Sequence, residues 1–205
     1  MKVLLINGSP RKNGNTFLAL SEVAKELERQ GIEAEILSLG THPVRSCIVC
    51  NTCKTKGDNR CVFDDDLCNT VTGKMQESDA LIIGSPVYYG QPNGGLLALI
   101  QRAFYSAGSA FTGKPAAAVA VCRRGGATAA LQTMTMPFMM MHMPVVTSQY
   151  WNIVYGRDAG EATMDAEGMQ TMRSLATNMA SILKATDGQP KPHYETRQAM
   201  NFIRP

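Results

Sequence analysis

Near its start the chain carries the stretch Lys2-Val3-Leu4-Leu5-Ile6-Asn7-Gly8-Ser9-Pro10-Arg11-Lys12-Asn13-Gly14-Asn15-Thr16. Its apolar part is typical of a short buried strand, and a helical pattern follows over residues 17–30. A polar, glycine-containing loop between a strand and a helix is suited to hold a phosphate. Backbone N–H groups at a helix start are unpaired and lie at the positive end of the helix dipole. Side chains add neutral donors and one guanidinium, so the candidate phosphate ligands are Ser9, Arg11, Asn13, Asn15 and Thr16.

This loop matches neither of two common nucleotide-binding patterns, G-x-x-x-x-G-K-[ST] and G-x-G-x-x-G. No Lys follows Gly14, so a triphosphate with its magnesium would lack the usual partner. Neutral donors better suit the single terminal phosphate of a mononucleotide. The alternative is an ordinary strand-to-helix turn with Thr16 near the N-cap. We favour the phosphate because so many donors converge on one helix start.

Strand and helix patterns alternate along the rest of the chain. Five strands alternating with helices imply a parallel sheet covered by helices on both faces. The expected strands are 3–7, 32–37, 80–84, 115–122 and 144–147, and the expected helices are 16–30, 69–78, 95–106, 127–140 and 164–184. The length of 205 residues fits one domain. We assign it to residues 1–185, with a cysteine-rich insert over 41–68 and a C-terminal tail over 186–205.

Composition excludes several classes of protein. The formal net charge of +3 is too small to indicate a nucleic-acid partner. The sequence lacks an apolar run of roughly eighteen residues, so we expect no membrane partner. A strand follows the start directly, so we expect no signal peptide and a cytoplasmic location. In that compartment the 6 cysteines favour metal binding or redox chemistry over disulfides.

Three loops are expected where the strands end, at the edge where doubly wound sheets bind ligands. They span 8–16, 85–92 and 122–126. The second contains Tyr88 and Tyr89, and its backbone could contact the polar edge of a flat ring; alternatively, these tyrosines only close the end of the sheet. The third contains adjacent glycines that let the backbone approach a ligand closely, although Arg124 could equally lie in a solvated turn.

Together, three motifs at 8–16, 84–88 and 123–126 resemble the NADPH-dependent FMN reductase family of flavodoxin-like proteins. The resemblance covers roughly residues 1–185 in order and spacing. It implies a flavodoxin-like fold, a five-stranded parallel sheet of order 2-1-3-4-5 with helices on both faces. It also implies FMN at the point where the strand order reverses, with its phosphate in the first loop. The further cofactor-binding residues that it implies are Pro86, Val87, Tyr88, Tyr89, Arg123, Gly125 and Gly126.

The insert contains the pattern C-x2-C-x2-C-x7-C, formed by Cys47, Cys50, Cys53 and Cys61. It resembles the compact cysteine motif of the iron–sulfur flavoproteins, a branch of the same family that carries a [4Fe–4S] cluster beside FMN. Such a cluster needs four thiolates, and the tight run supplies three of them to one face. At about 3.3 Å per residue, the intervening residues give the fourth thiolate ample reach.

Other interpretations of the insert remain open. Zinc usually takes two separated C-x2-C pairs, which this pattern lacks. The insert could also be a lid with free thiols near the flavin. In either case we expect it at the sheet edge that holds the phosphate loop. Cys68 and Cys122 lie outside the spacing and are expected to be inert.

These features indicate an FMN-dependent oxidoreductase in which NAD(P)H reduces the flavin and the flavin passes electrons to an acceptor. The acceptor could be a small molecule or a protein, and no side chain is required as an acid or base. The alternative is an iron–sulfur flavoprotein that carries electrons. Pure carriers are typically strongly acidic, whereas this chain is slightly basic. A methionine-rich stretch over 134–143 predicts a homodimer or homotetramer.

Overall fold

The structure is a computed structural model of the chain, and it describes residues 1–190, 192–196 and 198. Within this part, a parallel sheet has the order β2-β1-β3-β5-β6, and a short β4 pairs with the end of β3. Counted without β4, this is the order 2-1-3-4-5, so the expected flavodoxin-like sheet is confirmed. The strands are β1 (Lys2–Asn7), β2 (Glu33–Ser38), β3 (Ala80–Tyr88), β4 (Gln91–Pro92), β5 (Ala116–Cys122) and β6 (Ile153–Tyr155).

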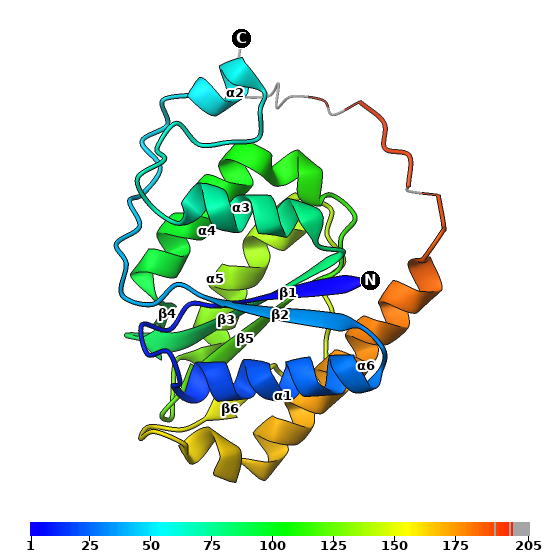
Figure 1. Cartoon of the computed structure of the whole chain (residues 1–205). Helices are drawn as coiled ribbons and strands as arrows, with labels where there is room; N and C mark the ends of the chain where they lie inside the picture. Colours follow the sequence, from blue (N-terminus) through cyan, green and yellow to red (C-terminus); the bar gives the residue numbers. More distant parts are fainter. Residues whose placement is uncertain (191, 197, 199–205) are drawn as a thin grey trace.

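Helices cover both faces of the sheet (Figure 1). On one face lie α1 (Asn15–Arg29) and α6 (Ala166–Thr186), and on the other lie α3 (Cys68–Glu77), α4 (Gly94–Ala107) and α5 (Ala127–Met140). Alternation along β1 separates two apolar cores, because successive side chains of a strand point to opposite faces. Val3 and Leu5 belong to the core under α1 and α6, whereas Leu4 and Ile6 belong to the other.

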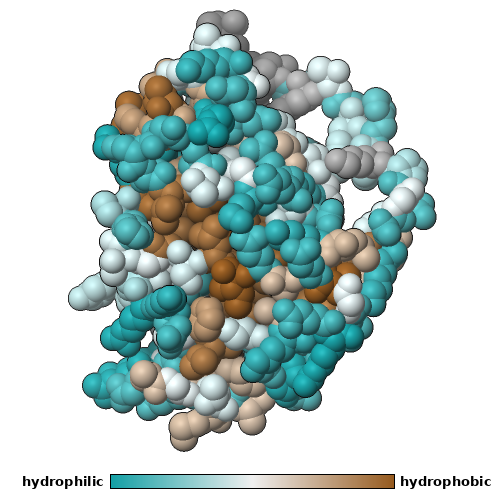
Figure 2. Space-filling model, viewed as in Figure 1, coloured by the Kyte–Doolittle hydropathy of each residue, from teal (hydrophilic) through white to brown (hydrophobic). Residues whose placement is uncertain are grey.

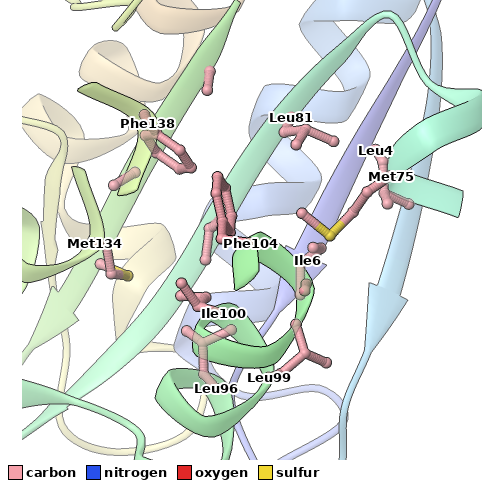
Figure 3. Packing of buried hydrophobic residues seen from close by; sticks show 14 of the residues in the cluster. Leu4, Ile6, Met75, Leu81, Leu96, Leu99, Ile100, Phe104, Met134 and Phe138 are labelled. Carbon is pink, nitrogen blue, oxygen red and sulfur yellow. The ribbon is translucent and has the colours of Figure 1, made fainter. Parts of the chain in front are cut away.

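Figure 3 shows the second core, in which α4 packs on the sheet. Leu96, Leu99, Ile100 and Phe104 of this helix are all buried. The ring of Phe104 lies 5.2 Å from that of Phe111, in the short 3-10 helix η1 (Gly108–Phe111). Because the apolar side of α4 is fixed on the core, its remaining side is directed toward the insert.

The fifth strand lies later in the sequence than predicted. The segment 144–147 makes a single bridge, from Val145 to Ala116, and then leaves the sheet. The strand beside β5 is β6, which pairs with Ala120–Cys122. Pro144 has no N–H that could donate a hydrogen bond to a neighbouring strand. The segment 144–147 is joined to Ala116 by two hydrogen bonds: the Ala116 N–H donates to the Pro144 carbonyl, and the Val146 N–H donates to the Ala116 carbonyl. The segment between the expected strand 144–147 and the expected helix 164–184 therefore contains β6, and the 3-10 helix η2 (Glu161–Met164) runs from this segment into the start of that expected helix.

The insert leaves the sheet after β2 and lies over α3 and α4 (Figure 1). It contains one short helix, α2 (Thr52–Lys56). Its apolar side chains Ile48, Val49 and Val62 are 63%, 61% and 46% exposed. Figure 2 shows hydrophobic surface at the upper left, where the insert lies.

Among the described residues, none of the helices is both long and apolar enough to cross a membrane. The predicted tail, 186–205, starts at the last residue of α6. Residues 191, 197 and 199–205 of that tail lie outside the part of the chain that the structure describes. The domain boundary at 185 and the cytoplasmic location stay predictions.

Candidate functional site

The three predicted loops meet at the carboxyl edge of the sheet. The Gly8 N–H donates to the Gly84 carbonyl at 2.8 Å, which joins the first loop to β3. A Cβ atom on Gly126 would lie 2.7 Å from the Gly90 Cα, so the second and third loops touch. Gly126 also has φ +83°, so glycine is required there both for space and for backbone conformation.

The start of α1 lacks a side-chain cap. Its N-cap is Gly14, and its first turn contains no acidic residue. By contrast, α4 and α6 are capped by the side chains of Asn93 and Asp165. Uncapped N–H groups at the positive end of a helix attract an anion. The α1 start is therefore suited to a phosphate.

The predicted phosphate ligands have different surroundings. Ser9 Oγ accepts a hydrogen bond from the Arg11 N–H at 3.1 Å, which leaves the hydroxyl proton free to donate to a ligand. Thr16 is only 2% exposed, and its hydroxyl makes no hydrogen bond within the described part of the chain. The side chains of Arg11 and Asn13 are exposed.

Asn15 has a structural role that the sequence did not indicate. Its Nδ2 donates to the Asp158 carbonyl at 2.9 Å, and its Oδ1 accepts from the Ala162 N–H at 3.2 Å. The side chain therefore holds the loop after β6 against the start of α1. Because the Asn15 side chain is used in this way, Asn15 would contribute its backbone N–H to a phosphate.

The second predicted loop, 85–92, is mostly strand: β3 continues to Tyr88, beyond its predicted end at 84, and a tight hairpin joins it to β4. Tyr88 pairs with Gln91, and the two connecting residues, Tyr89 and Gly90, have φ values of +51° and +77°. Positive φ at both central residues is typical of a type I′ turn. Tyr89 is fully exposed and Tyr88 is 44% exposed, whereas Pro86 and Val87 are half-buried. The tyrosines therefore do not plug the end of the sheet.

The third loop faces this hairpin. Arg123, Gly125 and Gly126 are exposed, and α5 begins after Gly126 without a side-chain cap. A Cβ on Gly126 would also lie 3.3 Å from Val87 Cγ1. The predicted cofactor-binding residues of the second and third loops are thus brought together, with exposed backbone between them.

The 4 motif cysteines line one pocket together with residues of α4. Cys53 is buried, Cys47 and Cys61 are half-buried, and Cys50 is exposed. On the α4 side, the Tyr105 hydroxyl hydrogen-bonds to Asn51 Oδ1 at 2.6 Å, which holds the cysteine run against the helix. The cysteines are therefore gathered, as the spacing predicted.

Hydrogen-bond donors surround three of the sulfur atoms. The Val49 N–H points at Cys47 Sγ at 3.4 Å, and Arg102 Nε donates to Cys61 Sγ at 3.2 Å. Hydrogen bonds from the side chain and the backbone of Thr52 lower the pKa of the Cys50 thiol. Metals bind the thiolate, and these donors stabilise that form.

The arrangement does not suit a single metal ion. Among the described residues, no three His, Cys, Asp or Glu side chains gather closely enough to hold one. A zinc site would need its thiolates on one atom. In a [4Fe–4S] cluster each thiolate binds its own iron, so the sulfur atoms stay further apart.

Two side chains that sequence reasoning missed hold the insert in place. The amide of Asn69 pairs with both the N–H and the carbonyl of Cys61, at 2.9 and 3.0 Å. Arg102 is buried in α4 and forms an ion pair with Asp66 of the insert. A lone arginine in an otherwise apolar helical stretch was the signal available for Arg102, whereas Asn69 gave none.

The expected place of the thiols was wrong. They lie against residues 102–106 of α4 and not at the sheet edge. Arg102 is nine residues beyond the Asn93 cap, which is about 13 Å along the helix axis. The insert contacts the outside of the helical layer, because Arg102 and Tyr105 supply its polar partners there.

The other two cysteines, Cys68 and Cys122, are buried and lie outside the lining of this pocket. Burial raises the pKa of the Cys68 thiol to about 11. Burial also raises the pKa of Cys122, at the end of β5.

The sheet order, with a polar loop and an uncapped helix start after the first strand, defines a flavodoxin-like protein. Residues 1–158 match the NADPH-dependent FMN reductase family, and the chain belongs to that family. It is therefore an FMN-dependent oxidoreductase.

Curated relatives share nearly the full length of the chain. An iron–sulfur flavoprotein of Methanocaldococcus jannaschii is 35% identical, over 90% of this chain and 98% of its own. An iron–sulfur flavoprotein of Archaeoglobus fulgidus is 32% identical, over 91% of this chain and 97% of its own.

Solved structures confirm the fold. The crystal structure of RosB with a bound intermediate, 8-demethyl-8-formylriboflavin-5′-phosphate, matches with a TM-score of 0.74 and 13% identity, over 100% of this chain and 93% of its own. A flavodoxin from the domain Archaea matches with a TM-score of 0.59 and 16% identity, over 90% of this chain and 99% of its own.

Proposed function

We propose that this protein is an iron–sulfur flavoprotein that transfers electrons between a reductant, FMN and a [4Fe–4S] cluster. The observation that carries the proposal is the pocket that gathers Cys47, Cys50, Cys53 and Cys61. A free-thiol lid would not need N–H and O–H donors directed at its sulfur atoms. The names of the full-length relatives support the same assignment.

The residues at the sheet edge fit FMN. The uncapped start of α1 and the hydroxyls of Ser9 and Thr16 would hold the phosphate, while Arg11 would neutralise part of its charge. The hairpin 85–92 and the loop 123–126 would border the flavin ring, because they face each other and expose backbone groups. When bound, FMN supplies the hydride and electron chemistry, and the chain supplies binding and orientation.

The insert fits a cluster. Three thiols come from the run 47–53, where positive φ values at Val49 and Asn51 bend the chain on either side of Cys50. Cys61 comes from the other arm of the insert, and Asn69 fixes its backbone. When bound, the cluster supplies one-electron chemistry, and the surrounding donors tune its potential.

NAD(P)H remains a proposed reductant, which the family description favours. The exposed tyrosines of the hairpin would lie beside a nicotinamide that approaches the flavin site. A single-electron partner, small molecule or protein, is the proposed acceptor. Mixing anaerobic protein with NADH or NADPH and following flavin absorbance would test the reductant. Unchanged flavin absorbance with both nucleotides would contradict that part of the proposal.

The test of the cluster is iron and sulfide analysis of anaerobically purified protein. We expect about four irons and four sulfides per chain, since a cubane contains that number. Cys50→Ser should lose iron and keep FMN, because the thiol pocket and the flavin loops are separate. Cys68→Ser is the matched control and should keep both, since that thiol lies outside the pocket lining. Iron-free protein with full flavin content would contradict the cluster and leave the flavin assignment standing.

A further inference from the structure

Arg102 is the most completely buried charged side chain of the described residues, with 0% of its side chain exposed. Burying an unpaired guanidinium is strongly unfavourable, so its partners must be complete. Within the part of the chain that the structure describes, every polar partner of the Arg102 side chain belongs to the insert. They are the Asp66 carboxylate, the carbonyls of Arg45 and Phe63, at 3.2 and 3.0 Å, and Cys61 Sγ, at 3.2 Å.

Two further contacts fix the plane of this guanidinium. The Phe63 ring lies 5.5 Å from Arg102 Cζ, and its centroid is 4.7 Å from Arg45 Cζ. The carboxylate of Asp66, 5% exposed, also accepts from the backbone N–H groups of Cys68 and Arg45. The contacts of the other guanidinium nitrogens therefore fix the direction of the Nε–H that donates to Cys61.

We propose that Arg102 is a positioning residue for the cluster: it fixes the Cys61 sulfur and raises the reduction potential of the cluster through a charged N–H···S hydrogen bond. The inference rests on the proposed function, because it concerns a cluster bound by Cys61. Cys61, as a ligand of the proposed cluster, is held at two points: Asn69 bonds to its backbone and Arg102 donates to its sulfur.

The direction of the effect follows from electrostatics. A cluster gains one negative charge when it takes up an electron. A positive charge and an N–H directed at one of its sulfur ligands stabilise that reduced form more than the oxidised form. Since the guanidinium is buried, salt and water screen this interaction little. Cys47 receives only a neutral backbone N–H, so the effect should be concentrated at Cys61.

The test compares Arg102→Gln with Arg60→Gln in anaerobic holoprotein. Arg60 is next to Cys61 in the sequence, but its side chain is 55% exposed and pairs with Asp64. Arg60→Gln therefore removes one positive charge near Cys61 without removing an N–H···S hydrogen bond. Arg102→Gln should shift the cluster midpoint potential to more negative values by at least the equivalent of a tenfold change in the oxidised-to-reduced ratio. For a one-electron couple that is about 59 mV. Arg60→Gln should shift it by clearly less.

A second variant covers the risk that Arg102→Gln does not fold, because it leaves Asp66 buried without its partner. Arg102→Met/Asp66→Asn removes both charges and keeps the side-chain volume. Its potential should still be more negative than that of the wild type, and its Fe–S(Cys) stretching frequencies in resonance Raman spectra should change. Loss of iron from both Arg102 variants, with FMN retained, would also support the positioning role.

The outcomes separate this inference from the proposed function. Iron-free wild-type protein would contradict the cluster, and this inference with it. Iron-loaded variants whose potentials and Raman spectra match the wild type would overturn the role of Arg102 and leave the cluster assignment intact. A shift of equal size in Arg60→Gln would also overturn it, because general charge would then explain the potential.

Discussion

At the scale of single residues, the Asn69 side chain makes several of the hydrogen bonds that hold the insert in place. It lies in the first turn of α3 and is 4% exposed. Its Nδ2 reaches the carbonyls of Cys61 and Phe63 and the Asp64 carboxylate, while its Oδ1 accepts from the Cys61 N–H. The position of the fourth thiol therefore depends on one amide in a neighbouring helix.

We expect Asn69→Ala to lower the free energy of unfolding by about 1–3 kcal/mol, because it leaves buried backbone groups without partners. The same change should reduce the iron content of anaerobic protein. Urea unfolding and iron analysis would measure the two effects. Asn178→Ala, which removes one exposed hydrogen bond to the Thr147 carbonyl, is the control and should have neither. Wild-type iron content in Asn69→Ala would contradict the role given to this amide.

Thr16 is the second residue whose role can be isolated. Among the predicted phosphate ligands, Thr16 is the residue that is itself buried and whose hydroxyl makes no hydrogen bond in the described part of the chain. Thr16→Val keeps the shape and removes the hydroxyl. We expect the FMN Kd to rise roughly 10- to 150-fold, since a hydrogen bond to a charged group contributes about 1.5–3 kcal/mol.

Fluorescence titration of flavin-free protein with FMN would measure this change. Thr177→Val on α6, whose hydroxyl bonds only within its own helix, is the control. Equal Kd values for Thr16→Val and the wild type would show that the phosphate does not contact this hydroxyl.

At the scale of elements, ion pairs connect the edge strand β2 to the neighbouring β1 and α3. Glu35 forms ion pairs with Lys2 of β1, at 2.7 Å, and with Lys74 of α3, at 2.5 Å. Hydrogen bonds from Lys2 and then from Lys74 lower the pKa of the Glu35 carboxyl below its ordinary value of 4.5. A lowered pKa in the folded state means that the carboxylate stabilises the fold above pH 4.5, and that this contribution is lost as pH falls through the folded-state pKa.

Glu35→Gln should therefore reduce stability at pH 7 by up to about 1 kcal/mol, the range for partly exposed ion pairs. The difference from the wild type should shrink as pH falls below 4.5. Urea unfolding between these pH values would measure it. Glu28→Gln on α1 is the control, because Glu28 is exposed and forms no ion pair within the described residues. A difference that grows at low pH would contradict this assignment.

At the scale of the whole molecule, some methionines of the stretch 134–143 are buried in the core and others are exposed at the surface. Met134 and Met143 are buried, whereas Met136, Met139 and Met140 are 60%, 64% and 63% exposed. Exposed apolar groups on one helix favour association with another copy of the chain. We therefore keep the prediction of a homodimer or homotetramer.

Sedimentation velocity at micromolar concentration should show a dimer or tetramer, and Met139→Glu/Met140→Glu should shift it toward monomer. Lys25→Glu on α1 is a control for added negative charge on an exposed helix position. Monomeric wild-type protein would contradict the prediction.

The sequence by itself determined the features that depend on neighbouring residues. Strand periodicity gave four of the strands, since alternation and apolar runs are local properties. The loops 8–16 and 122–126 follow from where those strands end, whereas β3 continues to Tyr88, past its predicted end at 84. The cysteine spacing indicated that the four thiols lie together. The polar loop after β1 predicts a phosphate site, because donors gathered at one helix start are a local feature, and this site stays a prediction.

Only the tertiary structure decided which distant segments meet. Whether 144–147 or 153–155 pairs beside β5 depends on hydrogen bonds to Ala116 and to Ala120–Cys122, which the sequence pattern does not encode. Arg102 is an ordinary helix residue until Asp66 and Cys61, 36 and 41 positions away, close around it. The insert lies on α4 for that reason: a buried charge is stable only where the fold completes its partners, and those partners are distant in sequence.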